Sequence, residues 1–185
     1  KGCVPTVNGR VLFQKSVATP LDQAASFDNI CKWAQQRFNK PNVIISKFIE
    51  NDAINQRMSF TAEEYMVFKD RFFVLDRTRI NYWMEIVCEE GQATVKFTRI
   101  TYWYDDEDEK GGIKMIAEEW ITDEHALNKK GTKVLPQSGK FRRKTIDRIE
   151  EIFENAMDMF ETKVKEEKAK ENKEEKVQKR QFVVE

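Results

Sequence analysis

The chain has 185 residues and a mass of 21.9 kDa, which is enough for one hydrophobic core and short for two. Its 32 basic and 32 acidic residues cancel, so no overall field attracts it to nucleic acid or to an anionic membrane, and any basic site must be local. No run approaches the roughly 20 apolar residues of a membrane-spanning helix.

The first part of the chain predicts strands around one helix. A strand is expected over residues 10–17, between the Asn8-Gly9 and Thr19-Pro20 turns. Ser26 is then expected to cap a helix that ends at Asn39, because apolar residues follow it at helical spacing. That apolar face consists of Phe27, Ile30, Cys31, Ala34 and Phe38.

Three further strands are expected before residue 76. The first covers residues 43–49, and a turn is predicted at residues 50–52. The second opens at residues 54–60, where Met58 and Phe60 alternate with polar residues. Residues 63–75 alternate less regularly and are interpreted as strand.

The hairpin that follows carries the clearest pattern. Residues 80–88 alternate between apolar and mixed side chains, and Glu90-Gly91 supplies the turn. In the return strand the inward phase slips by one residue near Thr98-Arg99, which predicts a β-bulge and a bent sheet with a concave face for a helix. The predicted inward residues are Ile80, Tyr82, Met84, Ile86, Cys88, Val95, Phe97, Ile100, Tyr102 and Tyr104.

The last third of the chain is predicted to be mainly helical. Thr122 is expected to cap a short helix that Gly131 stops, and a final helix carries one apolar stripe. Burying such side chains contributes ~1.5 to 3 kcal/mol each, so this helix should belong to the core. Its stripe consists of Ile146, Ile149, Phe153, Ala156, Phe160 and Val164.

These elements predict an α+β fold in one domain, residues 1–164, with a long C-terminal helix. Beyond Val164 the stripe is lost, so residues 165–185 are expected to form a charged helical extension or a disordered tail.

No catalytic, metal or cofactor motif is present in the sequence. His125 is the only histidine, the seven glycines form no phosphate-binding loop, and Cys3, Cys31 and Cys88 are too far apart for a zinc site. Buried free thiols are favoured over a disulfide for the last two cysteines. The acidic run at residues 104–112 lacks the ligand spacing of a calcium loop. We therefore expect no enzyme, no metal and no cofactor.

Two other features are candidate binding sites, one for a ligand and one for an anion. Trp83 and Trp103 fall on the outward phase of neighbouring strands and can stack across them, although core packing is favoured over a ligand for each tryptophan. The basic stretch at residues 139–147 precedes the predicted start of the last helix, where positive charge is unfavourable.

That basic stretch, "GKFRRKTID", needs negative groups nearby, and three sources are open: nucleic acid, a phosphate or other anion, or acids of the same chain. We favour the last, with Arg142 or Arg143 paired to the acidic segment 118–124 and the helix capped by Thr145 or Asp147. The candidate contacts to an anion or acidic partner are Lys140, Arg142, Arg143 and Lys144.

The segments "KFTRITYWY", "AEEWITDEHALNKKGTK" and "GKFRRKTID" resemble an uncharacterised family of domains from gut Bacteroides-type bacteria, described as having a TATA-binding-protein-like fold. The resemblance extends loosely over residues 4–164. It implies a curved antiparallel sheet with helices on one face, and export, which fits a chain that begins with Lys1. It lends no activity or site.

Three functions are therefore compared. The first is a non-catalytic module, periplasmic or elsewhere in the cell envelope, that binds a protein partner or a small ligand. The second is a nucleic-acid-binding module that uses residues 140–144, which zero net charge opposes. The third is an enzyme with an unrecognised site. A cytoplasmic location is the alternative to export.

Overall fold

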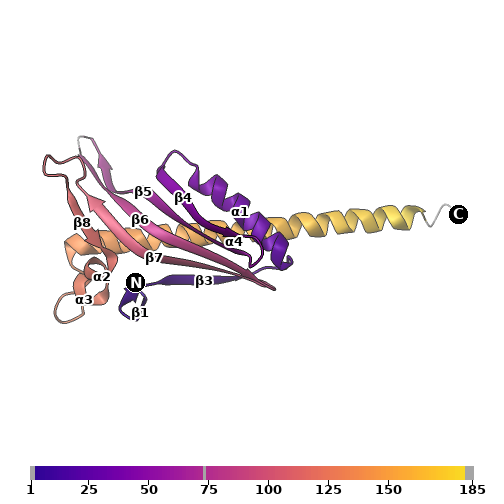
Figure 1. Ribbon diagram of the computed structural model, residues 1–185, viewed down its shortest axis with the longest axis horizontal. Coiled ribbons are helices and arrows are strands. Elements are labelled where there is room, and N and C mark those ends of the chain that lie inside the picture. The colour runs from indigo at the N-terminus through magenta and orange to yellow at the C-terminus, as the bar shows by residue number, and fades with distance from the viewer. Residues whose placement is uncertain (1–2, 73, 182–185) are drawn as a thin grey trace.

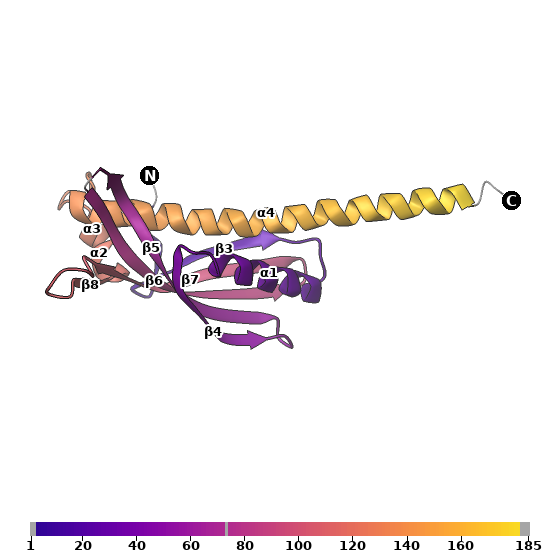
Figure 2. The same ribbon diagram turned by 90° about the horizontal axis from the view of Figure 1, so that it is seen from above.

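The computed structural model of the protein describes residues 3–72 and 74–181. One antiparallel sheet forms its centre, and a long helix runs along it and extends past it (Figures 1 and 2). The main strands, in spatial order, are β3 (Phe13–Ala18), β7 (Gln92–Tyr104), β6 (Val74–Glu89), β5 (Arg57–Arg71) and β4 (Val43–Asp52). A short strand, β8 (Ile113–Ile116), pairs with β7, and β1 (Thr6–Val7) and β2 (Arg10–Val11) form a separate hairpin.

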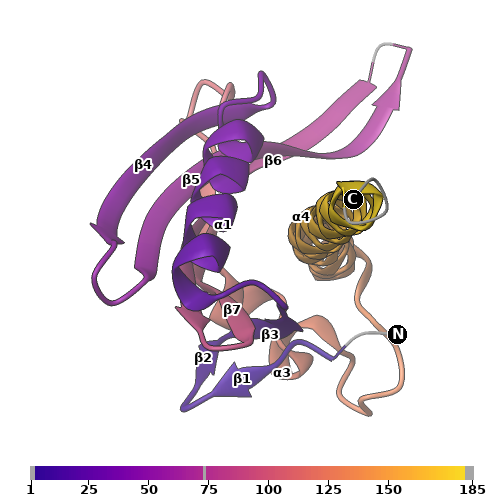
Figure 3. The ribbon, with the colours of Figure 1, turned by 90° about the vertical axis from the view of Figure 1, so that its right-hand side faces the viewer.

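The helices are α1 (Gln23–Phe38), α2 (Ala117–Trp120), α3 (Asp123–Ala126) and α4 (Pro136–Gln181). The two long helices, α1 and α4, lie on the same face of the sheet, which curves around them (Figure 3). Ring contacts define that face, because Phe38 of α1 and Phe153 of α4 pack on inward residues of neighbouring strands. The predicted α+β architecture, a curved antiparallel sheet with helices on one face, is confirmed.

The predicted phase of the central hairpin is also confirmed. All of its predicted inward residues from Ile80 to Tyr102 are buried, and the turn lies at Glu90-Gly91. The bulge is present where the phase slips. Trp83 pairs with Thr98 and Asn81 pairs with Thr101, and the intervening Arg99 has a φ of 52°.

Several predicted boundaries were wrong in the first half of the chain. Asp22, not Ser26, caps α1, since its carboxylate accepts a hydrogen bond from the Ala25 amide at 2.8 Å. Ser26 is instead buried inside the helix, 2.9 Å from the Thr19 hydroxyl. The strand expected over residues 10–17 is divided between β2 and β3.

The turn predicted at residues 50–52 lies later, at residues 53–56. The reason is that the Asp52 carboxylate accepts the amides of Ile54 and Asn55, both at 3.0 Å, and closes the turn after the strand has ended. Of residues 63–75, which we interpreted as strand, 63–71 and 74–75 are extended, but they belong to two strands, β5 and β6.

The helical third also differs from the prediction. The helix expected up to Gly131 is only α3. Thr122 does occupy its N-cap position, but its hydroxyl donates to the Glu118 carbonyl and accepts no hydrogen bond from an amide of the helix. The last helix begins at Pro136, about two and a half turns before Thr145. Proline suits the first position of a helix, where its missing N–H is not needed.

Residues of the predicted stripe of α4 are buried from Ile149 to Phe160, whereas the side chain of Val164 lies outside the described residues. The described side chains beyond Phe160 are exposed, and the helix continues to Gln181. Residues 182–185 of the predicted tail lie outside the description. No helix in the described part of the chain is both long enough and apolar enough to cross a membrane.

Candidate functional site

A gap in the sheet lies beside the bulge of β7. On this edge β3 pairs with β7 as far as Phe97, and β8 pairs with it from Thr101 onward. Residues 98–100 between them therefore have no strand neighbour there among the described residues. Because strands 4.7–4.9 Å apart normally leave no such space, an interruption of this kind opens a hollow at the sheet edge.

This hollow, the bulge pocket, has a volume of about 630 Å³. Its lining is mainly apolar, with Val11 and Ile100 fully buried beneath it. The amide of Val11 donates to Glu118 Oε1 at 2.9 Å, which ties β2 to α2 across the gap. The lining residues are Val7, Arg10, Val11, Leu12, Thr98, Arg99, Ile100, Thr101, Ile116 and Glu118.

A second hollow, the side pocket, adjoins the first on the sheet face that α1 and α4 leave uncovered. Its volume is about 400 Å³, and Thr101 and Ile116 line both pockets. Trp103 and Lys114 form part of its wall. The two pockets together therefore extend from the β2 hairpin to the outer side of β6.

Three cations in the lining of these pockets have no ion-pair partner among the described residues, although Glu118 and Glu63 also line the pockets. Arg10, Arg99 and Lys114 are exposed and form no ion pair with any described residue. Arg79, also in the side pocket, is different. Burial lowers the pKa of Arg79, but the hydrogen bond and charge of Asp106, 2.6 Å from Nε, outweigh it and raise that pKa above its ordinary value.

Two of these cations form cation–π contacts with the outward-facing tryptophans. The Arg99 guanidinium lies 4.6 Å from the ring centroid of Trp83, and Lys114 Nζ lies 4.9 Å from that of Trp103. Arg99 occupies the left-handed region, which costs a non-glycine residue about 1 kcal/mol or more. Backbone strain of this kind is concentrated at functional sites, and here it directs an arginine toward a pocket.

The four basic residues expected to act together at 140–144 are directed to different places. Lys140 Nζ donates to Asp76 at 2.9 Å and to the Tyr104 hydroxyl at 3.0 Å. Arg142, 5% exposed, pairs with Asp123 at 2.6 Å and donates to the Ile121 carbonyl at 2.8 Å. The expected pairing of this stretch with the acidic segment is thus present in Arg142.

Arg143 and Lys144, in contrast, are exposed on α4. They remain accessible to an external anion, but without the other two they form no four-residue basic patch. Thr145, which we had expected to cap the helix, is buried, and its hydroxyl lies 2.7 Å from that of Tyr102. The repulsion expected at a helix start does not arise, because the stretch lies inside the helix.

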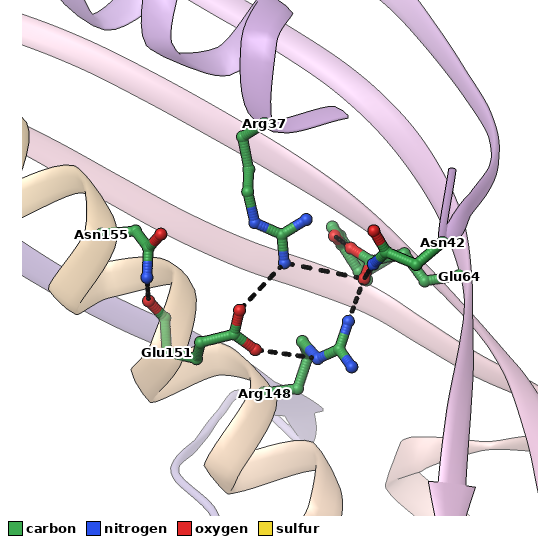
Figure 4. A network of polar contacts seen from close by, with 7 residues as sticks. Arg37, Asn42, Glu64, Arg148, Glu151 and Asn155 are labelled. Carbon is green, nitrogen blue, oxygen red and sulfur yellow. Dashed lines mark hydrogen bonds and ion pairs between the residues drawn. The ribbon is translucent and has the colours of Figure 1, made fainter. Parts of the chain in front are cut away.

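A buried charged cluster was not predicted from the sequence (Figure 4). Glu64 of β5 is 0% exposed and accepts a 2.5 Å hydrogen bond from Tyr82, with Arg148 of α4 also bonded to it. Arg37 of α1 lies 3.7 Å from Glu64 and 3.5 Å from Glu151. The cluster joins both long helices to the sheet.

The buried cluster has a structural role in this arrangement. Burial and the neighbouring Glu64 raise the pKa of Tyr82 well above its usual value, and the Glu64 carboxylate has no exposed surface through which to meet a ligand. One signal in the sequence pointed to it. Glu64 occupies an inward position in the alternation of Met58, Phe60, Ala62 and Met66.

The potential metal ligands and the cysteine thiols were also located in the structure. The described residues contain no group of three or more metal-ligating side chains, and the acidic loop directs Asp106 and Glu107 to Arg79 and Arg77. The three cysteines are free. Burial raises the pKa of Cys88 to about 12.

Comparison with known proteins gives the family and no activity. Residues 13–103 match the family model described as a domain of unknown function (DUF4468) with a TBP-like fold. No curated protein sequence matches the chain.

Two solved structures resemble the whole arrangement. One, a DUF4468 family protein from Bacteroides ovatus, is 34% identical with a TM-score of 0.78, and the match covers 86% of this chain and 91% of that one. The other, a TBP-like protein from Parabacteroides distasonis, is 22% identical with a TM-score of 0.70 over 86% and 98% of the two chains, which shows the fold alone. The fold, the family model and the identity to the Bacteroides ovatus protein together show that this chain belongs to the DUF4468 family.

Proposed function

We propose that this protein is a non-catalytic binding module of the cell envelope, and that its bulge and side pockets hold a small ligand with an apolar body and an anionic group. One observation carries the proposal. An apolar hollow of about 630 Å³ is lined by Arg10 and Arg99, and Lys114 lines the adjoining side pocket; none of the three has an ion-pair partner within the described residues. Ligand pockets of roughly 300–1,000 Å³ with an apolar lining and a few placed charges are typical of small-molecule sites.

The two halves of such a ligand would meet different chemistry. Its apolar part would cover Leu12 and Ile116, since burying apolar surface contributes about 25 cal/mol per Å². Its anionic group would meet Arg99 and Arg10, because the planar guanidinium can hold a carboxylate or phosphate through two hydrogen bonds. Glu118 also lines the pocket, but its Oε1 already accepts the Val11 amide.

Laurate, an amphipathic carboxylate, is a suitable first probe. Isothermal titration calorimetry should show binding of laurate but weaker binding of dodecyl maltoside, which has the same chain without charge, and of acetate, which has the charge without the chain. An Arg10→Ala, Arg99→Ala variant should bind laurate about tenfold less tightly, because each charge-assisted hydrogen bond contributes ~1.5 to 3 kcal/mol before solvent screening.

The matched control is an Arg143→Ala, Lys144→Ala variant, which also removes two exposed cations but on α4, away from the pockets. Its affinity for laurate should equal that of the native protein. Equal affinities in both variants, or equal binding of laurate and the maltoside, would contradict the proposed site.

The location in the envelope needs a separate test. It is supported by the resemblance described above and not by the geometry of the pockets. Fractionation of cells that express the full gene should recover the protein in the envelope or periplasmic fraction. Recovery with cytoplasmic markers would refute this part of the proposal and leave the binding site untouched.

A further inference from the structure

The outer edge of β4 is uncovered. This strand ends the strand order of the sheet, and none of its ten residues is buried. Figure 3 shows it at the rim, with β5 on one side and no described element along the other. An edge strand of this length presents backbone N–H and C=O groups that can pair with another strand.

The same edge is apolar. Four of its residues are large and 38 to 60% exposed, namely Ile44, Ile45, Phe48 and Ile49. Proteins usually keep such side chains away from a long exposed edge, because the combination favours strand addition. This edge is therefore suited to a β-strand partner.

A bulge in β4 arranges its charges. The register skips Ile49, so that Phe48 faces Phe60 and Glu50 faces Ser59 on β5. Lys47 faces Thr61, and Ser59 and Thr61 belong to the same face because they are two residues apart on a strand. Lys47 and Glu50 consequently share one face, on either side of Phe48. Both are exposed and form no ion pair within the described residues.

We propose that a second copy of this chain pairs with β4 in antiparallel fashion, about a twofold axis at Phe48. Ile49 is the extra residue of the bulge and takes no place in the register. Lys47 of each copy therefore lies opposite Glu50 of the other, and the two Phe48 side chains meet at the axis. The surface is therefore complementary to itself, as a twofold interface requires. An unrelated peptide would need to supply the same charge pattern by chance.

The proposed contact is one strand wide, at the small end of specific interfaces, so the dimer should be weak and dependent on concentration. Sedimentation velocity over a concentration series measures its dissociation constant. Lys47→Glu and Glu50→Lys should each weaken the dimer about tenfold, because two opposite-charge pairs become like-charge pairs.

An equimolar mixture of these two variants is the decisive sample. In a mixed dimer both cross-strand pairs regain opposite charges, so the mixture should associate with an affinity close to that of the native protein. Lys129→Glu is the matched control, because it reverses an exposed lysine in the loop after α3. That change should leave the dissociation constant unaltered.

Three results would overturn the proposal. They are a native protein that stays monomeric up to its solubility limit, a mixture that associates no better than either variant alone, and a Lys129→Glu variant as weakened as Lys47→Glu. Thermal melts of each variant confirm folding. Since the substituted side chains are exposed, their effect on the melting temperature should be small.

Discussion

Replacing Arg148 by methionine tests the buried cluster directly. Methionine keeps most of the apolar volume of the arginine stem but removes the charge that is bonded to Glu64. Glu64 would then be a carboxylate with no exposed surface, left with the Tyr82 hydroxyl at 2.5 Å, the Asn42 side-chain amide at 3.5 Å and Arg37 at 3.7 Å. Removing one member of a buried ion pair costs ~3 to 5 kcal/mol. Because these three partners remain, we expect a loss of about 3 kcal/mol, the lower end of that range.

Urea unfolding, followed by tryptophan fluorescence and by circular dichroism, measures this loss. The same substitution at Arg77 is the control, because the side chain of its partner Glu107 is 78% exposed and the pair should contribute only ~0 to 1 kcal/mol. A Glu64→Gln, Arg148→Met variant should recover part of the stability, since no buried charge is left unpaired. A loss below about 1 kcal/mol for Arg148→Met, or no recovery in the double variant, would refute the reasoning.

Three further predictions concern the core, the extension and alkaline pH. Phe153→Ala should cost ~3 to 5 kcal/mol in urea unfolding, because the ring is buried against Phe97, and a loss under 1 kcal/mol would mean that α4 is not docked. Truncation after Lys165 should leave the melting temperature nearly unchanged; a large fall would show that the exposed end of α4 has a partner. Cys88 and Tyr82 have raised folded-state pKa values, so their contributions to stability are complete below the unfolded pKa and are lost as pH rises. For Cys88 this stability is lost between pH 9 and about pH 12. A melting temperature that does not decrease as the pH is raised through that range would contradict the burial of these groups.

The cell-envelope location, the absence of catalysis and the identity of a ligand stay predictions. The family assignment lends none of them, because the matching family model and the two solved structures are described without an activity. The uncovered pockets and the uncovered edge of β4 lie at different parts of the sheet. Their tests are therefore independent of each other.

The amino-acid sequence by itself determined the features that depend on neighbouring residues. The alternation from Ile80 to Cys88 specified which side chains of the central hairpin are buried, because a slip of one residue would reverse its faces. The change of phase near Thr98-Arg99 located the bulge to within a few residues, and a stripe of large apolar residues identified α4 as a core helix. These patterns repeat every two or 3.6 residues, so a short window contains all the information.

Only the tertiary structure decided the features that join distant parts of the chain. Glu64 and Arg148 are 84 residues apart, and Arg142 and Asp123 are 19 residues apart, so no local pattern could predict these pairs. The same holds for the contact of Lys140 with Asp76. The start of α4 was missed for a related reason. Its basic residues looked unfavourable near a helix start, but the helix begins earlier, at Pro136, and contains them. The bulge pocket likewise exists because β3 and β8, which are far apart in the sequence, pair with the same edge of β7 and leave residues 98–100 between them.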